Sequence, residues 1–266
     1  MSTRPQDFML EPDPTKQGDR NKRFALSWIY NWGYSTAPII QLLLGHQGMT
    51  WTANAVNGGW LRKTGATSRE RIKVVTLTAK GVVWVEQRRR QIFRYSELDP
   101  HRIAPLTIWH NLLAQRATVY AIRAGKAKSY LTERQDATKS RRGEKKPDAI
   151  WITEANERIG VEIELNAKWD QRFDEFVSST IAALSPAADG APARFQKFIV
   201  LTTSPALASR YAAAFDPGAP LRLWRGTSKS EAVVERTVKV PDWVRERIEF
   251  SVVDDNGKEL SPSPTT

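Results

Sequence analysis

Three acidic residues in the second half of the chain have the types and spacing needed to hold a metal ion. Asp148 follows Pro147, and Glu162 and Glu164 stand two positions apart in an apolar run. If that run is a strand, both glutamates project from the same face. Carboxylates on neighbouring strands suit a hard divalent cation, which can activate water and stabilise charge on a phosphodiester. The sequence therefore predicts a site for a hard divalent cation at these carboxylates.

The same residues also have simpler interpretations. Pro-Asp is a common turn dipeptide, and Glu162 between apolar neighbours fits the solvent face of an edge strand. Lys168, four residues after Glu164, fits the solvated start of a helix. Both interpretations stay open at this stage.

The elements that would position these acids follow from periodicity. Two β-rich runs are separated by a turn-like stretch at 154–157, and apolar residues then recur every three or four positions over 169–184, as in an amphipathic helix. This alternation of helices and strands predicts an α/β domain with a mixed central sheet. Its predicted elements are a helix over 106–122, strands over 149–153 and 159–165, the helix over 169–184, a strand over 195–202, a helix over 205–215 and a strand over 221–224. Residues 225–258 receive no assignment.

The first half of the chain shows a different order, three short helices followed by a strand pair. The first helix ends at Gly33, the second runs from Ser35 or Thr36 to Gly45, and the third runs from Thr50 or Thr52 through Leu61. A strand over 73–78, a turn at Lys80-Gly81 and a returning strand over 82–85 are expected next. This order is typical of a winged helix-turn-helix, and the string 75–81 resembles its second wing strand and turn.

In such a fold the third helix enters the major groove and the wing lies over phosphates. Small polar side chains would then face base edges, and cations would face the backbone. A winged helix used only for protein contacts is the alternative. The predicted DNA-binding residues are Thr52, Asn54, Asn57, Arg62, Lys63, Arg69, Arg71, Lys73 and Lys80.

Composition narrows the class of protein. The 266 residues carry a formal net charge of +11 with no cysteine and three histidines, which excludes a disulfide scaffold and a cysteine-ligated metal centre. Ten Lys and Arg against two acids lie between Arg62 and Arg94, whereas Phe24 to Leu61 carries no charge. Clustered cations favour a polyanionic partner. No run is long enough to span a membrane and the N-terminus is no signal peptide, so a soluble cytoplasmic protein is expected.

A polar, proline-flanked seam near 97–105 predicts two domains. The predicted division is a flexible arm over 1–21, a winged-helix DNA-binding domain over 22–98, a second domain over 104–258 and a flexible tail over 259–266.

The acidic constellation resembles a known motif. Pro147-Asp148, followed 14 residues later by Glu162-Ile163-Glu164, is similar to the PD-(D/E)xK motif of restriction-endonuclease-like nucleases. Glu164 stands where that motif has lysine, and Lys168 is placed to return an ammonium to the site. The resemblance implies an α+β or α/β chain in which a winged helix precedes a restriction-endonuclease-like mixed-sheet domain.

A narrower resemblance covers most of residues 20–215. The chain is similar to the plasmid replication-relaxation family and to the MOBC-class mobilisation relaxases, which join a winged helix to such a nuclease-like core. The matching stretches are Trp109-His110-Asn111-Leu112-Leu113, Tyr130-Leu131-Thr132-Glu133-Arg134, Lys146-Pro147-Asp148, and Val161-Glu162-Ile163-Glu164-Leu165 with Lys168.

The resemblance implies roles for individual residues. Asp148 and Glu162 would bind Mg²⁺ or Mn²⁺ with the Ile163 carbonyl, and Glu133 would orient a water or the metal. Lys168 would stabilise the pentavalent phosphate, and His110 would shuttle a proton or contact a phosphate. Glu164 shares the face of Glu162 and counts among the candidate catalytic residues.

Together these patterns predict a DNA-binding protein of a plasmid or mobile element that nicks or relaxes double-stranded DNA at a specific site. Relaxosome or conjugation proteins are further expected partners, and a homodimer stays open. The alternatives are a catalytically inactive nuclease-like DNA-binding regulator or relaxosome accessory protein, and a purely architectural protein. Covalent and hydrolytic cleavage both stay open, because nothing singles out a tyrosine, Tyr120 and Tyr130 near the expected site included.

Overall fold

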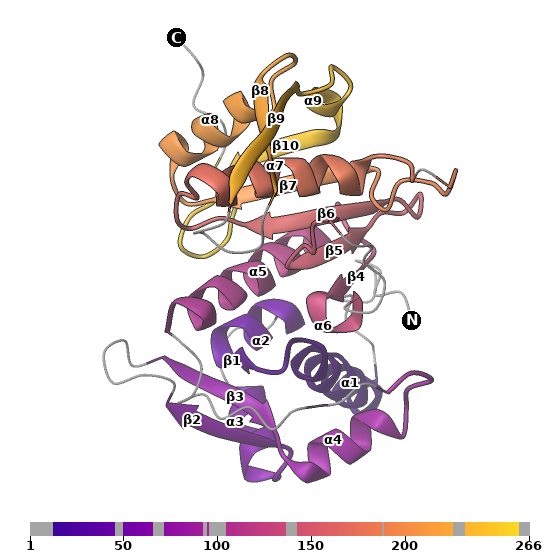
Figure 1. The fold of residues 1–266 in the computed structure, drawn as a ribbon. Helices are drawn as coiled ribbons and strands as arrows, with labels where there is room; N and C mark the ends of the chain where they lie inside the picture. The colour runs from indigo at the N-terminus through magenta and orange to yellow at the C-terminus, as the bar shows by residue number, and fades with distance from the viewer. Residues whose placement is uncertain are drawn as a thin grey trace. The chain divides into compact units, whose positions relative to one another are not determined.

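The computed structural model describes residues 13–45, 50–65, 72–92, 95, 105–136, 143–187, 189–225 and 232–260. The chain is a mixed α+β protein that divides into two compact units, Met1–Gln135 (unit 1) and Asp136–Thr266 (unit 2) (Figure 1). The predicted boundary at 98–104 lies outside the described residues. Helix α5 (Pro105–Arg123), which the sequence placed in the second domain, groups with unit 1.

Unit 1 begins with helices whose ends are set by capping residues. Oδ1 of Asp13 accepts from the Thr15 amide at 2.9 Å, and Gly33, with φ of +88°, follows the last helical residue. Residues 14–21, predicted as part of a flexible arm, are therefore helical, whereas 1–12 lie outside the described residues. The helices before α5 are α1 (Pro14–Trp32), α2 (Ala37–Leu44), α3 (Thr50–Asn57) and α4 (Ala79–Glu86).

The small sheet of unit 1 differs from the predicted strand pair. Strand β3 (Lys73–Leu77) lies between β1 (Ser35–Thr36) and β2 (Leu61–Gly65), and both pairings are antiparallel. Helix α3 ends at Asn57, before Gly58 and Gly59, so its predicted extension through Leu61 is wrong.

The returning strand predicted over 82–85 is also wrong, because these residues belong to α4. Oγ1 of Thr78 accepts from the Gly81 amide at 3.2 Å and caps the helix. Gly81 is required there, since a Cβ at this position would lie 2.5 Å from the carbonyl oxygen of Trp60.

The charge-free stretch from Phe24 to Leu61 supplies much of the unit 1 core. Trp28, Ile29, Ile39 and Ile40 are buried. Gln115 of α5 satisfies the buried polar groups among them, because its Oε1 accepts from Trp28 Nε1 at 2.9 Å and its Nε2 donates to a backbone carbonyl. Unit 1 ends with strand β4 (Ser129–Thr132) and the short helix α6 (Glu133–Asp136), whose last residue opens unit 2.

The sheet of unit 2 is mixed, as the sequence predicted. Its strands follow the order β10-β7-β6-β5, in which β5 and β6 are antiparallel, whereas β6, β7 and β10 are parallel. The carboxyl ends of β6, β7 and β10 therefore meet at one edge of the sheet. The bounds are β5 (Ala149–Ile152), β6 (Arg158–Ile163), β7 (Lys197–Thr202) and β10 (Ile248–Val252).

Two helices return from that edge, α7 (Asp170–Leu184) after β6 and α8 (Pro205–Ala214) after β7 (Figure 1). The unassigned segment 225–258 contains β9 (Val233–Lys239), which pairs with β8 (Pro220–Arg225) in a separate hairpin. It also contains α9 (Val244–Arg247) and β10. The central strands are buried on both faces, which is why their sequences read as continuous apolar runs.

Two further expectations concern the chain end and membranes. In the predicted tail, Glu259 forms an antiparallel bridge with Val253, and Ser261–Thr266 lie outside the described residues. Among the described residues, no helix has both the length and the apolar content that crossing a membrane requires.

Candidate functional site

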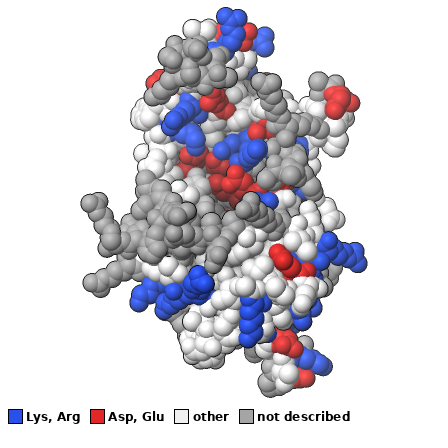
Figure 2. Space-filling model, turned by 60° about the horizontal axis from the view of Figure 1, so that its bottom comes forward, with Lys and Arg blue, Asp and Glu red and all other residues white. Residues whose placement is uncertain are grey.

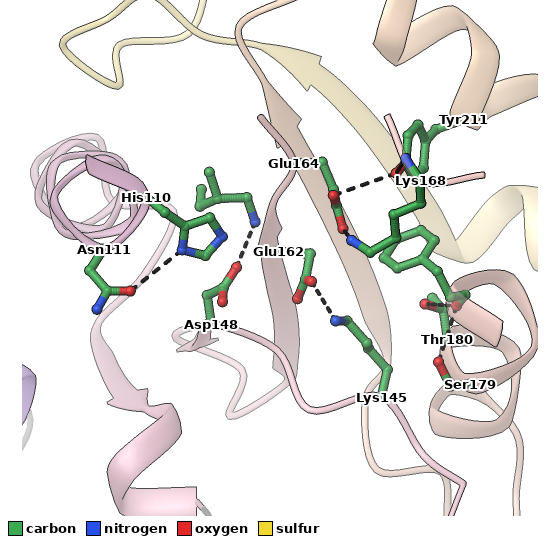
Figure 3. Close-up of polar contacts among 12 residues, drawn as sticks. His110, Asn111, Lys145, Asp148, Glu162, Glu164, Lys168, Ser179, Thr180 and Tyr211 are labelled. Atoms are coloured by element: carbon green, nitrogen blue, oxygen red, sulfur yellow. Dashed lines mark hydrogen bonds and ion pairs between the residues drawn. The ribbon is translucent and has the colours of Figure 1, made fainter. Parts of the chain in front are cut away.

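The antiparallel pairing of β5 with β6 brings Asp148 and Glu162 to facing positions. Ala149 pairs with Val161, so the next step along the ladder sets Asp148 opposite Glu162. Oδ2 of Asp148 accepts a hydrogen bond from the Ile163 amide at 2.8 Å (Figure 3). This bond fixes one carboxylate beside the strand that carries the other.

Glu162 is a buried carboxylate with one oxygen satisfied and one not. Glu162 is only 5% exposed, and its Oε1 pairs with the ammonium of Lys145 (Figure 3). Oε2 is buried and has no hydrogen-bond partner within the described part of the chain. Because a buried unpaired oxygen costs free energy, this atom faces a position suited to a missing donor or cation.

The electrostatics of Glu162 follow from its surroundings. Burial, followed by the charge of Asp148, raises the pKa of Glu162 to about 8, while Lys145 and Lys168 oppose the rise. A metal ion shared by the two carboxylates would remove this repulsion.

Glu164, just beyond the end of β6, has its own partners. It is 4% exposed, pairs with Lys168 Nζ through Oε1, and accepts from the Tyr211 hydroxyl through Oε2 at 3.5 Å. The Lys168 amide donates to the same hydroxyl at 3.3 Å. Burial lowers the pKa of Lys168 to about 8 and raises that of Tyr211.

A divalent cation at Asp148 and Glu162 would need its remaining ligands from water or substrate. Asp148, Glu162 and Glu164 carry three formal negative charges against two on Lys145 and Lys168, so the cluster is net acidic. In a strand, the N–H and C=O of one residue point to the same side. The Ile163 carbonyl therefore points to the side of β6 on which the Ile163 amide donates to Asp148. Within the described ranges, however, no group of three or more His, Cys, Asp or Glu residues could hold a metal.

The structure brings together four of the six predicted catalytic residues, all in unit 2. They are Asp148, Glu162, Glu164 and Lys168. The other two, His110 and Glu133, belong to unit 1. His110 Nδ1 lies 3.4 Å from Asn111 Oδ1, and Glu133 is exposed at the start of α6.

Sequence reasoning missed two residues of the cluster, Lys145 and Tyr211. Lys145 belongs to a basic segment that ends at Lys146, directly before Pro147, which is a signal available in the sequence. Nothing in the sequence marks Tyr211. The two tyrosines considered from the sequence lie in unit 1, where Tyr130 is half-buried and its hydroxyl accepts from Asn31 at 3.1 Å.

The residues predicted to bind DNA divide into surface and buried groups. Asn54 and Asn57 of α3 are exposed, whereas Thr52 is only 5% exposed, so its predicted contact with base edges is corrected. Lys80 Nζ donates to the Gly58 carbonyl at 2.9 Å and lies 4.2 Å from the Trp60 ring centroid. Exposed cations on β2 and β3 are Arg62, Lys63 and Lys73, while Arg69 and Arg71 lie outside the described residues.

On the face shown in Figure 2, lysine and arginine side chains stand in separate groups, and several of these groups lie beside aspartate and glutamate side chains. Comparisons with family models, with curated proteins and with solved structures find no match for this chain.

Proposed function

We propose that this chain binds double-stranded DNA and cleaves one strand by metal-dependent phosphodiester chemistry, as a relaxase or replication-relaxation protein does. One observation carries the proposal. Asp148 and Glu162 face each other across two strands, and Oε2 of Glu162 is buried with no hydrogen-bond partner among the described residues. A buried carboxylate with an unsatisfied oxygen, facing a second, half-buried carboxylate, is an arrangement that a divalent cation would complete.

In this proposal unit 2 is a restriction-endonuclease-like domain. Asp148 and Glu162 would hold Mg²⁺ or Mn²⁺, with the Ile163 carbonyl on the same edge. The ion would supply an activated water and stabilise charge on the phosphate. Lys145 and Lys168 place positive charge beside the two acids, where a phosphate would approach, and the Tyr211 hydroxyl holds Glu164 in place.

Unit 1 would dock the duplex as a winged helix. Its order α1-β1-α2-α3-β2-β3 and the sheet order β1-β3-β2 support this proposal. Helix α3 presents Asn54 and Asn57 to solvent, and β2 and β3 expose Lys63 and Lys73. Amides for base edges and cations for phosphates support DNA binding.

A second function, a DNA-binding regulator without cleavage, is favoured by a specific observation. Glu164 occupies the motif position of lysine and pairs with Lys168, so the ammonium that would stabilise the phosphate is already neutralised by a carboxylate. The chain would then bind duplex DNA without cleaving it, and relaxosome proteins would be further partners.

The test is a nicking assay on a supercoiled plasmid that carries DNA flanking the gene for this chain. Wild type is compared with Asp148→Asn and Glu162→Gln, with Mg²⁺, Mn²⁺ or a chelator. Glu249→Gln is the matched control, because Glu249 also pairs with a lysine from a neighbouring strand. Duplex binding is measured in parallel at several salt concentrations.

We expect nicking by wild type and Glu249→Gln in the presence of metal, and its loss in both site variants with duplex binding retained. Duplex binding without nicking under either metal would overturn the enzyme in favour of the regulator. Absence of both activities would overturn both.

A further inference from the structure

The residue after Lys168 is an exposed tryptophan. Trp169 is 66% exposed, the highest value among the large apolar side chains of the described residues. It directly precedes α7 and is joined through one peptide bond to the lysine that pairs with Glu164. An aromatic surface therefore begins at the edge of the carboxylate–lysine cluster.

Arg210 of α8 covers one face of this ring. Its guanidinium carbon lies 3.8 Å from the Trp169 ring centroid and 4.6 Å from that of Phe173. Its NH2 donates to the Lys168 carbonyl at 2.7 Å, which ties the stack to the backbone beside the cluster. The indole is thus held in position, and a ligand that stacks on it would not need to immobilise a free side chain.

Two further features of this locus are unusual. NH1 of Arg210 is buried without a hydrogen-bond partner, so part of its donor capacity is not satisfied within the described part of the chain. Asp170 has φ of +45°, in the left-handed region that non-glycine residues rarely adopt. The two residues before Asp170 have different surroundings: the Lys168 side chain pairs with Glu164, whereas the Trp169 side chain is exposed. Backbone strain of this kind is concentrated at functional sites.

We propose that Trp169, backed by Arg210, is a stacking platform for a nucleobase of single-stranded DNA next to the phosphate held at the carboxylate–lysine cluster. The inference rests on the proposed function and names its substrate form, a strand with unpaired bases. Aromatic rings bind every base through its π-face, whereas lysines contact the backbone. Lys168 and Trp169 provide these two groups in adjacent residues.

Binding of a labelled oligothymidylate of about 15 nucleotides, measured by fluorescence anisotropy with a chelator present, tests this platform. An abasic strand of the same length and charge is the second ligand. Trp169→Ala should weaken binding of oligothymidylate by about fivefold or more, the low end of base–aromatic stacking, and leave abasic binding unchanged. Trp169→Phe should retain most of the affinity, because it keeps a π-face.

Trp243→Ala is the matched control. Arg247 lies 5.1 Å from the Trp243 ring centroid, so this residue also forms a tryptophan–arginine pair. It precedes β10, whereas Glu164 follows β6, and because these strands run parallel the two lie at opposite ends of the sheet. The control should bind both strands as wild type does.

Equal affinity of wild type and Trp169→Ala for oligothymidylate would overturn the inference, as would an equal loss on both strands. The outcome is separable from that of the proposed function, since binding with a chelator needs no cleavage. If wild type nicks DNA and Trp169→Ala binds oligothymidylate as wild type does, only the stacking platform is overturned. If Trp169→Ala weakens binding of oligothymidylate but not of the abasic strand, and wild type does not nick DNA, only the cleavage activity is overturned.

Discussion

The amide of Ile163 donates a 2.8 Å hydrogen bond to Oδ2 of Asp148. Through this bond the residue that precedes β5 is held against the end of β6, next to Glu162. The position of the first acid therefore depends on the backbone of the strand that carries the second. Different substitutions of Asp148 can therefore test its role as a metal ligand separately from its contribution to stability.

Asp148→Asn should leave the free energy of unfolding close to that of wild type, because an amide oxygen can still accept from Ile163. Asp148→Ala removes the acceptor and should cost about 1–3 kcal/mol, the usual result of leaving a partly buried amide unpaired. Urea denaturation of the two variants measures the difference. Equal stability of both variants would show that the bond contributes little.

Lys145 and Glu162 should be energetically coupled. Lys145→Met leaves the buried carboxylate of Glu162 without its cation. Because Glu162 can take up a proton, the loss in the free energy of unfolding should be smaller than that caused by an uncompensated buried charge, which is about 3–5 kcal/mol. In Glu162→Gln the same lysine substitution should cost less still. A double-mutant cycle by chemical denaturation measures the coupling, and additive effects would contradict it.

Stability of the metal-free protein should decline with pH because of Glu162. Its pKa is about 8 when folded against the ordinary 4.5, so the folded state binds more protons between these values. The free energy of unfolding should fall as pH rises from 4.5 to 8, by at most about 1.4 kcal/mol per pH unit from this group. Glu162→Gln should remove this slope, as measured by denaturation with a chelator present.

At higher pH, Lys168 should change the free energy of unfolding in the direction opposite to Glu162. Burial lowers its pKa from 10.5 to about 8, so between these values the unfolded state binds more protons. Its contribution to the free energy of unfolding therefore rises with pH in that window. Lys168→Met, compared with wild type over the same pH series, should lack the rise, and an unchanged profile would contradict the assignment.

Gly160 of β6 should tolerate no side chain. A Cβ there would lie 2.5 Å from the Phe198 ring, so Gly160→Ala should destabilise the protein by about 1–3 kcal/mol through overpacking. Gly18→Ala is the matched control, because Gly18 lies exposed in α1 with nothing near its missing Cβ. This control should gain up to about 1 kcal/mol from helix propensity. Thermal unfolding of both variants measures the contrast.

The periodic elements of unit 2 could be predicted because apolar spacing depends on burial alone. The strands at 149–153 and 159–165 and the helix at 169–184 are confirmed to within one or two residues. In unit 1 the same reasoning gave a wrong prediction for residues 82–85. The β-branched valines in this segment favour a strand, yet the Thr78 cap and the close approach of Gly81 to Trp60 place the segment in α4.

The site could be predicted only in part for a related reason. Asp148, Glu162 and Glu164 stand out because acids interrupt apolar strands. Lys145 and Tyr211 are ordinary in sequence, and their roles arise only where the chain brings them to a carboxylate. Ion pairs between residues distant in sequence leave no local pattern.

The sequence by itself determined most helices and strands of unit 2 up to residue 225, and that Glu162 and Glu164 stand two positions apart at the end of one apolar run. These properties depend on side-chain alternation and on capping residues within a few positions. Only the tertiary structure decided that Glu162 is buried with one oxygen unpaired among the described residues, that each glutamate has its own lysine, and that Arg210 holds Trp169. Burial and charge pairing depend on strand order and packing, which join residues that the sequence keeps apart.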